Sequence, residues 1–424
     1  MRATRWVIAL LIGLVATAAA DPAPDPERQA IAAYRAKDYA GFLAAMRVVA
    51  ARDPGVPRVR YNLASAAALG GSPDEAVAIL RALAGTGLSF AIDKDDDFRG
   101  LARRADFQAV VRTMTQNLTP RGKAEPAFTL TERGLLTEGV AYDPDSQTWF
   151  VSSVRHRKIV AIDAHGKQRD FVAEAAGGIG GVFGMSVDRT RRVLWATSAR
   201  VPQMAGYRAE DKDVSGVFKL DLATGKLLAT YAVPPDGKPH VLGDVIVAPS
   251  GDAYATDSAT PTLYRIPAAG RALEVVVAGG FQSLQGLALA PDQKRLYVAD
   301  YARGLYAIDL ASKAVSRIAA PPRFATTGID GLYLHRGRLV ATQNGTEPRR
   351  VIELGLDATG TSVVSQHVVL AGDPRIRDLS LGVVVGDALY LNAAAGWESY
   401  DAAGAAKPDA PDAPHAILKL ALLR

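Results

Sequence analysis

Apolar positions in the first quarter of the chain follow a helical period. Apolar residues recur every three or four positions in three runs, residues 31–50, 61–69 and 77–84. Clusters of Gly and Pro separate these runs. The pattern predicts short helices joined by tight turns over residues 25–118. Ser72 is expected to be an N-cap residue, with Glu75 completing a capping box.

The predicted helices resemble tetratricopeptide repeats, best in the stretch RYNLASAAALGGSPDEAVAIL. The resemblance implies helix pairs with a period near ~34 residues. Two roles remain open for this segment. Repeats of this kind bind peptides or partner proteins, and a protein partner is therefore one expectation. The other is a helical cap packed on the domain that follows.

A polar stretch broken by Pro and Gly, residues 119–126, reads as a linker. Beyond it the apolar period changes from 3.6 to 2, which indicates short strands. A unit of strand, polar turn and strand then occurs six times: EGVAYDPDSQTWFVSS, FGMSVDRTRRVLWATS, GDVIVAPSGDAYATDS, QGLALAPDQKRLYVAD, DGLYLHRGRLVATQ and SLGVVVGDALYLN. This repetition predicts a six-bladed β-propeller over residues 127–424. The fold class is then mainly β, with an N-terminal α-helical, tetratricopeptide-like domain.

The way the ring closes is also predicted. The last unit has only three strands of its own, near 382–385, 388–392 and 416–422, with a low-complexity insertion at 400–414. The segment 127–134 is free just ahead of the first unit. We expect it to supply the missing outer strand of the last blade, while residues 401–414 form an exposed loop.

The amino-acid composition excludes some kinds of active site, and the N-terminal residues predict where the protein is located. The chain has 424 residues, 49% of them hydrophobic, and no Cys, which excludes thiolate nucleophiles and Cys-ligated metals. Residues 1–20 have two Arg, an apolar run and an A-x-A site, as in a signal peptide. An uncleaved anchor is the alternative. Cleavage would lower the net charge of +5 by the charges of Arg2 and Arg5. We expect an exported, periplasmic or secreted protein with no membrane span after cleavage and no nucleic-acid partner.

The starts of the repeats carry a family resemblance. EGVAYD, GDVIVAPSG, QGLALAPD and DGLYL resemble blade starts of the SMP-30/gluconolactonase family of six-bladed propellers. In that family, residues before the blade-start Gly hold a divalent metal at the channel mouth. The resemblance implies Glu138, Gln285 and Asp330 as ligands here, with Asp244 beside Gly243. Calcium is the expected ion and zinc the alternative. The six equivalent positions are Glu138, Phe183, Gly243, Gln285, Asp330 and Ser380.

The resemblance also implies a metal-dependent hydrolase of the lactonase or esterase type. Asp330 would be the catalytic base, Glu138 a metal ligand, and a small lactone or ester the substrate. His240, close to a blade start, and Arg155, after a strand of the first blade, are candidates for substrate binding. The alternative is a non-catalytic envelope propeller that binds proteins or ligands. Convergence of the four oxygen ligands on one point would favour the hydrolase, whereas an apolar plug such as Phe183 would favour the alternative.

Overall fold

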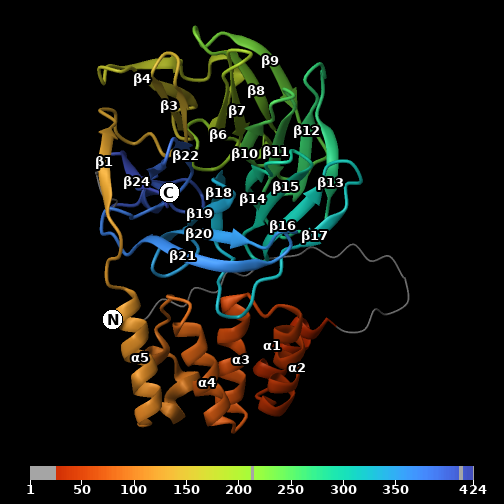
Figure 1. Ribbon diagram of the computed structural model, residues 1–424, viewed down its shortest axis with the longest axis vertical. Helices are drawn as coiled ribbons and strands as arrows, with labels where there is room; N and C mark the ends of the chain where they lie inside the picture. The colour runs from red at the N-terminus through yellow and green to blue at the C-terminus, as the bar shows by residue number, and fades with distance from the viewer. Residues whose placement is uncertain (1–24, 212–213, 410–413, 424) are drawn as a thin grey trace.

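A computed structural model describes residues 25–211, 214–409 and 414–423 of the chain. It has an N-terminal helical segment beside a ring of six four-stranded sheets, so the predicted fold class is confirmed (Figure 1). The predicted signal peptide, residues 1–20, lies outside the described residues. None of the helices in the described ranges is long and apolar enough to cross a membrane.

Five α-helices make up the N-terminal segment, and they bury Phe42, Leu80 and Phe107 in a shared core. Ser72 is the N-cap residue of its helix as predicted, but within the described chain its side chain makes no capping hydrogen bond. The capping box is therefore wrong, because Glu75 pairs instead with Arg47 at 2.6 Å. The α-helices are α1 Pro26–Arg35, α2 Tyr39–Arg52, α3 Pro57–Leu69, α4 Pro73–Ala84 and α5 Ala105–Asn117.

Each blade is an antiparallel sheet whose first strand lies innermost, along the channel. Middle strands such as β4, β7 and β11 are buried along their whole length because the faces of neighbouring blades pack against each other. The first blade consists of β2 Thr137–Asp143, β3 Thr148–Ser153, β4 Lys158–Ile162 and β5 Gln168–Val172. The second consists of β6 Gly181–Asp188, β7 Val193–Ala199, β8 Ser215–Asp221 and β9 Leu227–Ala232. The third consists of β10 Leu242–Val247, β11 Ala253–Asp257, β12 Thr262–Ile266 and β13 Glu274–Ala278. The fourth blade consists of β14 Leu284–Leu289, β15 Arg295–Asp300, β16 Gly304–Asp309 and β17 Val315–Arg317. The fifth consists of β18 Ile329–His335, β19 Arg338–Gln343, β20 Arg350–Leu356 and β21 Val363–Ala371.

The sixth blade joins the two ends of the propeller. It consists of β22 Gly382–Val385, β23 Ala388–Asn392, β24 Ala416–Ala421 and, as its outer strand, β1 Ala124–Thr129. The predicted mode of closure is confirmed, but the strand starts three residues earlier than expected, inside the stretch that reads as a linker. Across this seam Trp149 of the first blade contacts Tyr390 and Phe128, with ring centroids 4.3 and 5.4 Å away.

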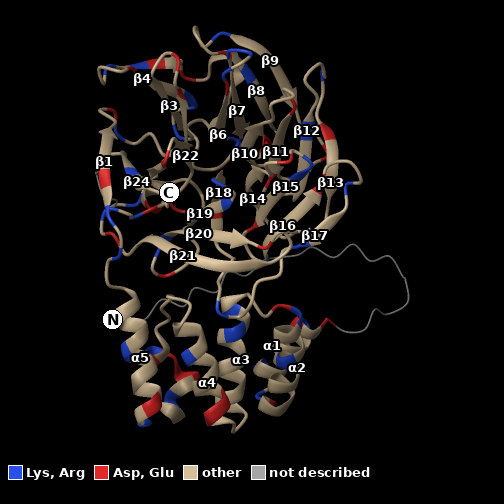
Figure 2. Ribbon diagram, in the orientation of Figure 1, with Lys and Arg blue, Asp and Glu red and all other residues tan. Residues whose placement is uncertain are grey.

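The helical segment packs against blades four and five. Arg317 of β17 pairs with Asp53, and Arg60 of α3 donates to the carbonyl oxygen of Pro322. Buried Arg350 of β20 donates to the carbonyl oxygen of Thr86 at 2.9 Å. Figure 2 shows basic and acidic residues interspersed over both parts in this view.

Candidate active site

The blade starts share a local distortion that sets up the site. In five of the six blades, the register between the innermost strand and its neighbour shifts where the blade starts, for example between Thr137 and Val140. A residue freed from regular pairing in this way can aim its side chain into the channel. The repeated Gly lets neighbouring inner strands approach closely. A Cβ on Gly139 would lie 2.3 Å from the carbonyl oxygen of Phe183, and one on Gly286 would lie 2.3 Å from the amide nitrogen of Leu332.

Hydroxyl groups on the second strands satisfy the backbone groups that these shifts leave unpaired. Ser152 accepts a hydrogen bond from the Gly139 amide at 2.7 Å, and Thr342 accepts one from the Gly331 amide at 2.8 Å. Thr256 donates to the Gln285 carbonyl at 2.7 Å. The same device on several blades therefore fixes the inner strands around the channel.

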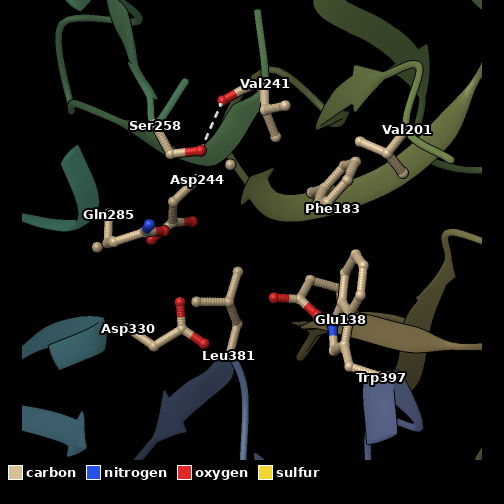
Figure 3. Close-up of a pocket in the computed structure, with 12 residues that line it drawn as sticks. Glu138, Phe183, Val201, Val241, Asp244, Ser258, Gln285, Asp330, Leu381 and Trp397 are labelled. Carbon is tan, nitrogen blue, oxygen red and sulfur yellow. Dashed lines mark hydrogen bonds between the residues drawn. The ribbon is translucent and has the colours of Figure 1, made fainter. Parts of the chain in front are cut away.

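These inner strands surround a cavity of about 210 Å³ (Figure 3). It is smaller than the roughly 300–1,000 Å³ of pockets for drug-sized ligands, so it suits a small molecule. Phe183 lines one side without filling it. The four oxygen-bearing side chains predicted from the blade starts all reach it. The lining is Glu138, Phe183, Val201, Val241, Gly243, Asp244, Ser258, Gln285, Gly286, Asp330, Leu381 and Trp397.

Neighbouring groups orient the acidic side chains. The indole Nε1 of Trp397 donates to Glu138 Oε2 at 2.7 Å. Asn344 Nδ2 donates to Asp330 Oδ2 at 2.8 Å, while the hydroxyl of Tyr301 donates to Asn344 Oδ1 at 2.9 Å. Among the described residues, one oxygen of Glu138 and one of Asp330 have no hydrogen-bond partner.

The acidic groups perturb one another. Burial, and then the charge of Asp330, raise the pKa of Glu138 well above its usual range. Burial together with the charge of Asp378 raises the pKa of Asp330 to about 7. Burial and the charge of Asp330 raise the pKa of Asp244 to about 7, although the Val245 amide opposes the shift. No Lys, Arg or His belongs to the described lining, so the protein supplies no cation inside the cavity to balance these carboxylates.

The donor set determines which metal the cavity suits. No three His, Asp or Glu side chains form a ready metal-binding group within residues 25–211, 214–409 and 414–423. Instead, three carboxylates, Glu138, Asp244 and Asp330, share the cavity with an amide. The Gln285 Nε2 donates to the Ser283 hydroxyl at 3.0 Å, which leaves the amide oxygen of Gln285 free. Oxygen donors fit a hard cation such as Ca²⁺. The lining has none of the imidazole or thiolate ligands that predominate in zinc sites, so its oxygen donors favour Ca²⁺ over zinc.

Two residues predicted to bind substrate do not line this cavity. His240 is buried, with Nδ1 2.6 Å from Asp257 Oδ2 and Nε2 3.0 Å from Asp236 Oδ1. Both ring nitrogens are therefore occupied behind the cavity wall, where Val241 and Ser258 provide the lining. Arg155 turns away as well, because Nη1 donates to the carbonyl oxygen of Gln203 at 2.9 Å and the guanidinium stacks over Tyr400.

Sequence reasoning missed Trp397, which is part of the connection between β23 and β24. Its only signal is a lone Trp in the otherwise small-residue stretch NAAAGWESY. The loop after it was expected to be exposed, and its described part mostly is. It still packs locally, because Gln203 Nε2 donates to the carbonyl oxygen of Asp401 at 2.9 Å. Residues 410–413 of that loop lie outside the described ranges.

Comparison with known proteins gives a family and several similar folds. Comparison with curated proteins finds no match. The solved structures similar to this chain include a gluconolactonase from Xanthomonas campestris, 17% identical, with a TM-score of 0.45, covering 72% of this chain and 98% of that one. They also include a luciferin-regenerating enzyme, 14% identical, with a TM-score of 0.49, covering 72% and 96%. A PQQ-bound aldose sugar dehydrogenase from Streptomyces coelicolor is 17% identical, with a TM-score of 0.48, covering 71% and 98%.

The family model described as the SMP-30/gluconolactonase/LRE-like region matches residues 136–346. This match begins at the first blade and runs into the fifth, so it includes the blade starts that carry Glu138, Asp244, Gln285 and Asp330. Through its propeller, this chain therefore belongs to the SMP-30/gluconolactonase-like family.

Proposed function

We propose that this protein is a cation-dependent hydrolase of small lactones or esters and that the reaction takes place in the channel cavity. The observation that carries the proposal is that two carboxylates, buried Glu138 and half-buried Asp330, share one cavity with a free amide oxygen, while the described lining has no cationic side chain. Uncompensated buried charges are costly, and a bound hard cation offsets that cost.

Glu138, Gln285 and Asp330 are the residues that would hold the cation. When bound, a divalent cation polarises the substrate carbonyl and lowers the barrier to attack by water. Asp244 stands next to Gly243, the position where the family has Asn, and adds a further oxygen at the cavity.

Asp330 is assigned the role of general base. Because Asn344 occupies Oδ2, the other oxygen, Oδ1, is free to accept a proton from the attacking water. The water oxygen bonds to the carbonyl carbon, the bond between that carbon and the ring or ester oxygen breaks, and the leaving oxygen takes up the proton that Asp330 removed from the water. Asn344, held by Tyr301, positions the Asp330 carboxylate for this transfer.

Cation binding and hydrolysis can be tested on the purified full chain. Ca²⁺ at 100 times its Kd is expected to add about 2.7 kcal/mol of stability, enough to raise the melting temperature by several degrees. Glu138→Gln and Asp330→Asn each remove a negative charge from the cavity, so they are expected to fold while losing both this shift and hydrolysis of a panel of lactones and esters. Glu125→Gln, on the exposed edge strand β1, is the matched control and is expected to behave like the wild type.

A melting temperature that does not respond to Ca²⁺, together with no hydrolysis across the panel, would contradict the proposal. That result would favour the non-catalytic binding platform.

A further inference from the structure

We infer that the substrate of this cavity carries an apolar substituent and is not a polyhydroxylated sugar lactone. The inference rests on the proposed function for the reaction, but the preference for apolar ligands is a property of the cavity that binding alone can test. It follows from how the lining is divided between polar and apolar side chains.

Three apolar side chains, Phe183, Val201 and Trp397, form a wall on one side of the cavity. Figure 3 shows Phe183, Val201 and Trp397 opposite Asp244, Gln285 and Asp330, with Glu138 beside Trp397. Val241 and Leu381 extend the apolar lining. A ligand placed between the two sides would direct its carbonyl to the carboxylates and its remaining atoms to the wall.

The wall is backed by a packed core and is therefore a fixed surface. Phe183 and Val201 are only 5% and 9% exposed and belong to one buried cluster with Leu136, Val154, Ala199 and Met204. Phe183 stacks with Trp397 at a centroid distance of 6.2 Å. A polar substituent directed at this wall would lose its water and meet no polar group in exchange.

Each neutral side-chain donor of the described lining already has a protein acceptor. The indole of Trp397 donates to Glu138, the amide nitrogen of Gln285 donates to Ser283, and the hydroxyl of Ser258 donates to the carbonyl oxygen of Val241 at 3.3 Å. The described lining also has no Lys, Arg or His. Several ring hydroxyls of a sugar lactone would therefore compete for the acidic side alone, and those that face the wall would be left unpaired.

The expected selectivity follows from apolar burial. Each methylene that reaches the wall improves kcat/KM and binding by about fourfold, until the substituent outgrows the cavity. The reverse order is expected for added hydroxyls, because each one must lose water without a partner.

The experiment compares δ-valerolactone, its δ-alkyl derivatives and glucono-δ-lactone as substrates. In parallel, calorimetry measures the binding of the corresponding δ-lactams, which share the ring shape and resist hydrolysis. Val201→Thr places a hydroxyl in the wall at nearly constant volume, and Phe183→Leu shortens the wall without adding a polar group. Val214→Thr, at a position 49% exposed, is the matched control.

Affinity that rises with alkyl length, and rises less steeply in Val201→Thr than in Val214→Thr, supports the inference. Alkyl-dependent lactam binding without hydrolysis of any lactone would support the apolar preference and refute the proposed reaction. Hydrolysis of glucono-δ-lactone at least as efficient as that of the alkyl lactones would overturn the inference and leave the reaction standing. Lactam binding that is indifferent to the alkyl chain would also overturn it.

Discussion

The seam between the first and last blades offers a direct test of how the ring is held closed. Phe128 lies on β1, the outer strand of the last blade, and its ring contacts Trp149 of the first blade. Trp149 in turn contacts Tyr390 of β23. Phe128→Ala would remove the contact between β1 and the first blade while leaving the backbone pairing of β1 with β24 in place.

The size of the effect follows from the packing. Removal of a fully buried Phe costs about 3–5 kcal/mol. Phe128 is half-buried, so about half of that is expected, together with about 0.5–1.5 kcal/mol for the aromatic pair. The free energy of unfolding should therefore fall by roughly 2–4 kcal/mol.

Urea unfolding followed by tryptophan fluorescence measures this change, because Trp149 itself stands at the seam. Leu228→Ala is the matched control, since Leu228 lies on the outer strand of the second blade, away from the seam, and is 51% exposed. We expect the control to cost about 1 kcal/mol or less. Equal losses in the two variants would refute the view that the aromatic contacts across the seam stabilise the closed ring.

Two further changes test other parts of the fold. Gly139→Ala places a Cβ 2.3 Å from the carbonyl oxygen of Phe183, so overpacking is expected to lower the free energy of unfolding by roughly 1–3 kcal/mol, measured by thermal unfolding. The control Gly100→Ala, where a Cβ would have no neighbouring atom within 4 Å, should cost less than half as much. Equal costs would contradict the close approach of the inner strands. Burial opposes protonation of His240, but Asp257 and Asp236 outweigh it and raise the pKa of His240 above 6.5. The contribution of protonated His240 to stability is therefore complete below pH 6.5 and is lost as the pH rises through the folded-state pKa. The free energy of unfolding that His240→Asn loses relative to the wild type, measured by urea unfolding, should shrink between pH 6 and pH 9. A loss that grows with pH would refute this assignment.

The repeat pattern predicted the architecture because each blade obeys the same local rules. Period-2 strands, polar turns and a Gly at most blade starts are properties of short segments, and they fix six sheets whose first residues face the channel. This is why Glu138, Asp244, Gln285 and Asp330 could be placed at one cavity from their positions in the repeats. The same reasoning identified the closing segment, although β1 starts three residues before and ends five residues before the predicted segment 127–134.

What failed depends on contacts between segments that are distant in sequence. His240 lies close to a blade start, but its ring turns toward Asp257 on β11, and no local pattern encodes that choice. Trp397 reaches Glu138 from an irregular connection whose course the sequence does not determine. In the helical segment, Ile31 and Tyr34 fit the apolar period yet are 52% and 43% exposed, because α1 is the outermost helix of the described segment.

The pairing of β1 with β24 also constrains the order of events during synthesis. Ala124 pairs with Leu420, about 300 residues further along the chain, so β1 leaves the ribosome long before its partner exists. The helices before it have local contacts and can fold early, and five blades can form in sequence, but β1 keeps an open edge throughout. The ring can therefore close only after β24 has been synthesised. A nascent chain halted before residue 416 could form the first five blades but not the sixth, which joins the two ends of the propeller.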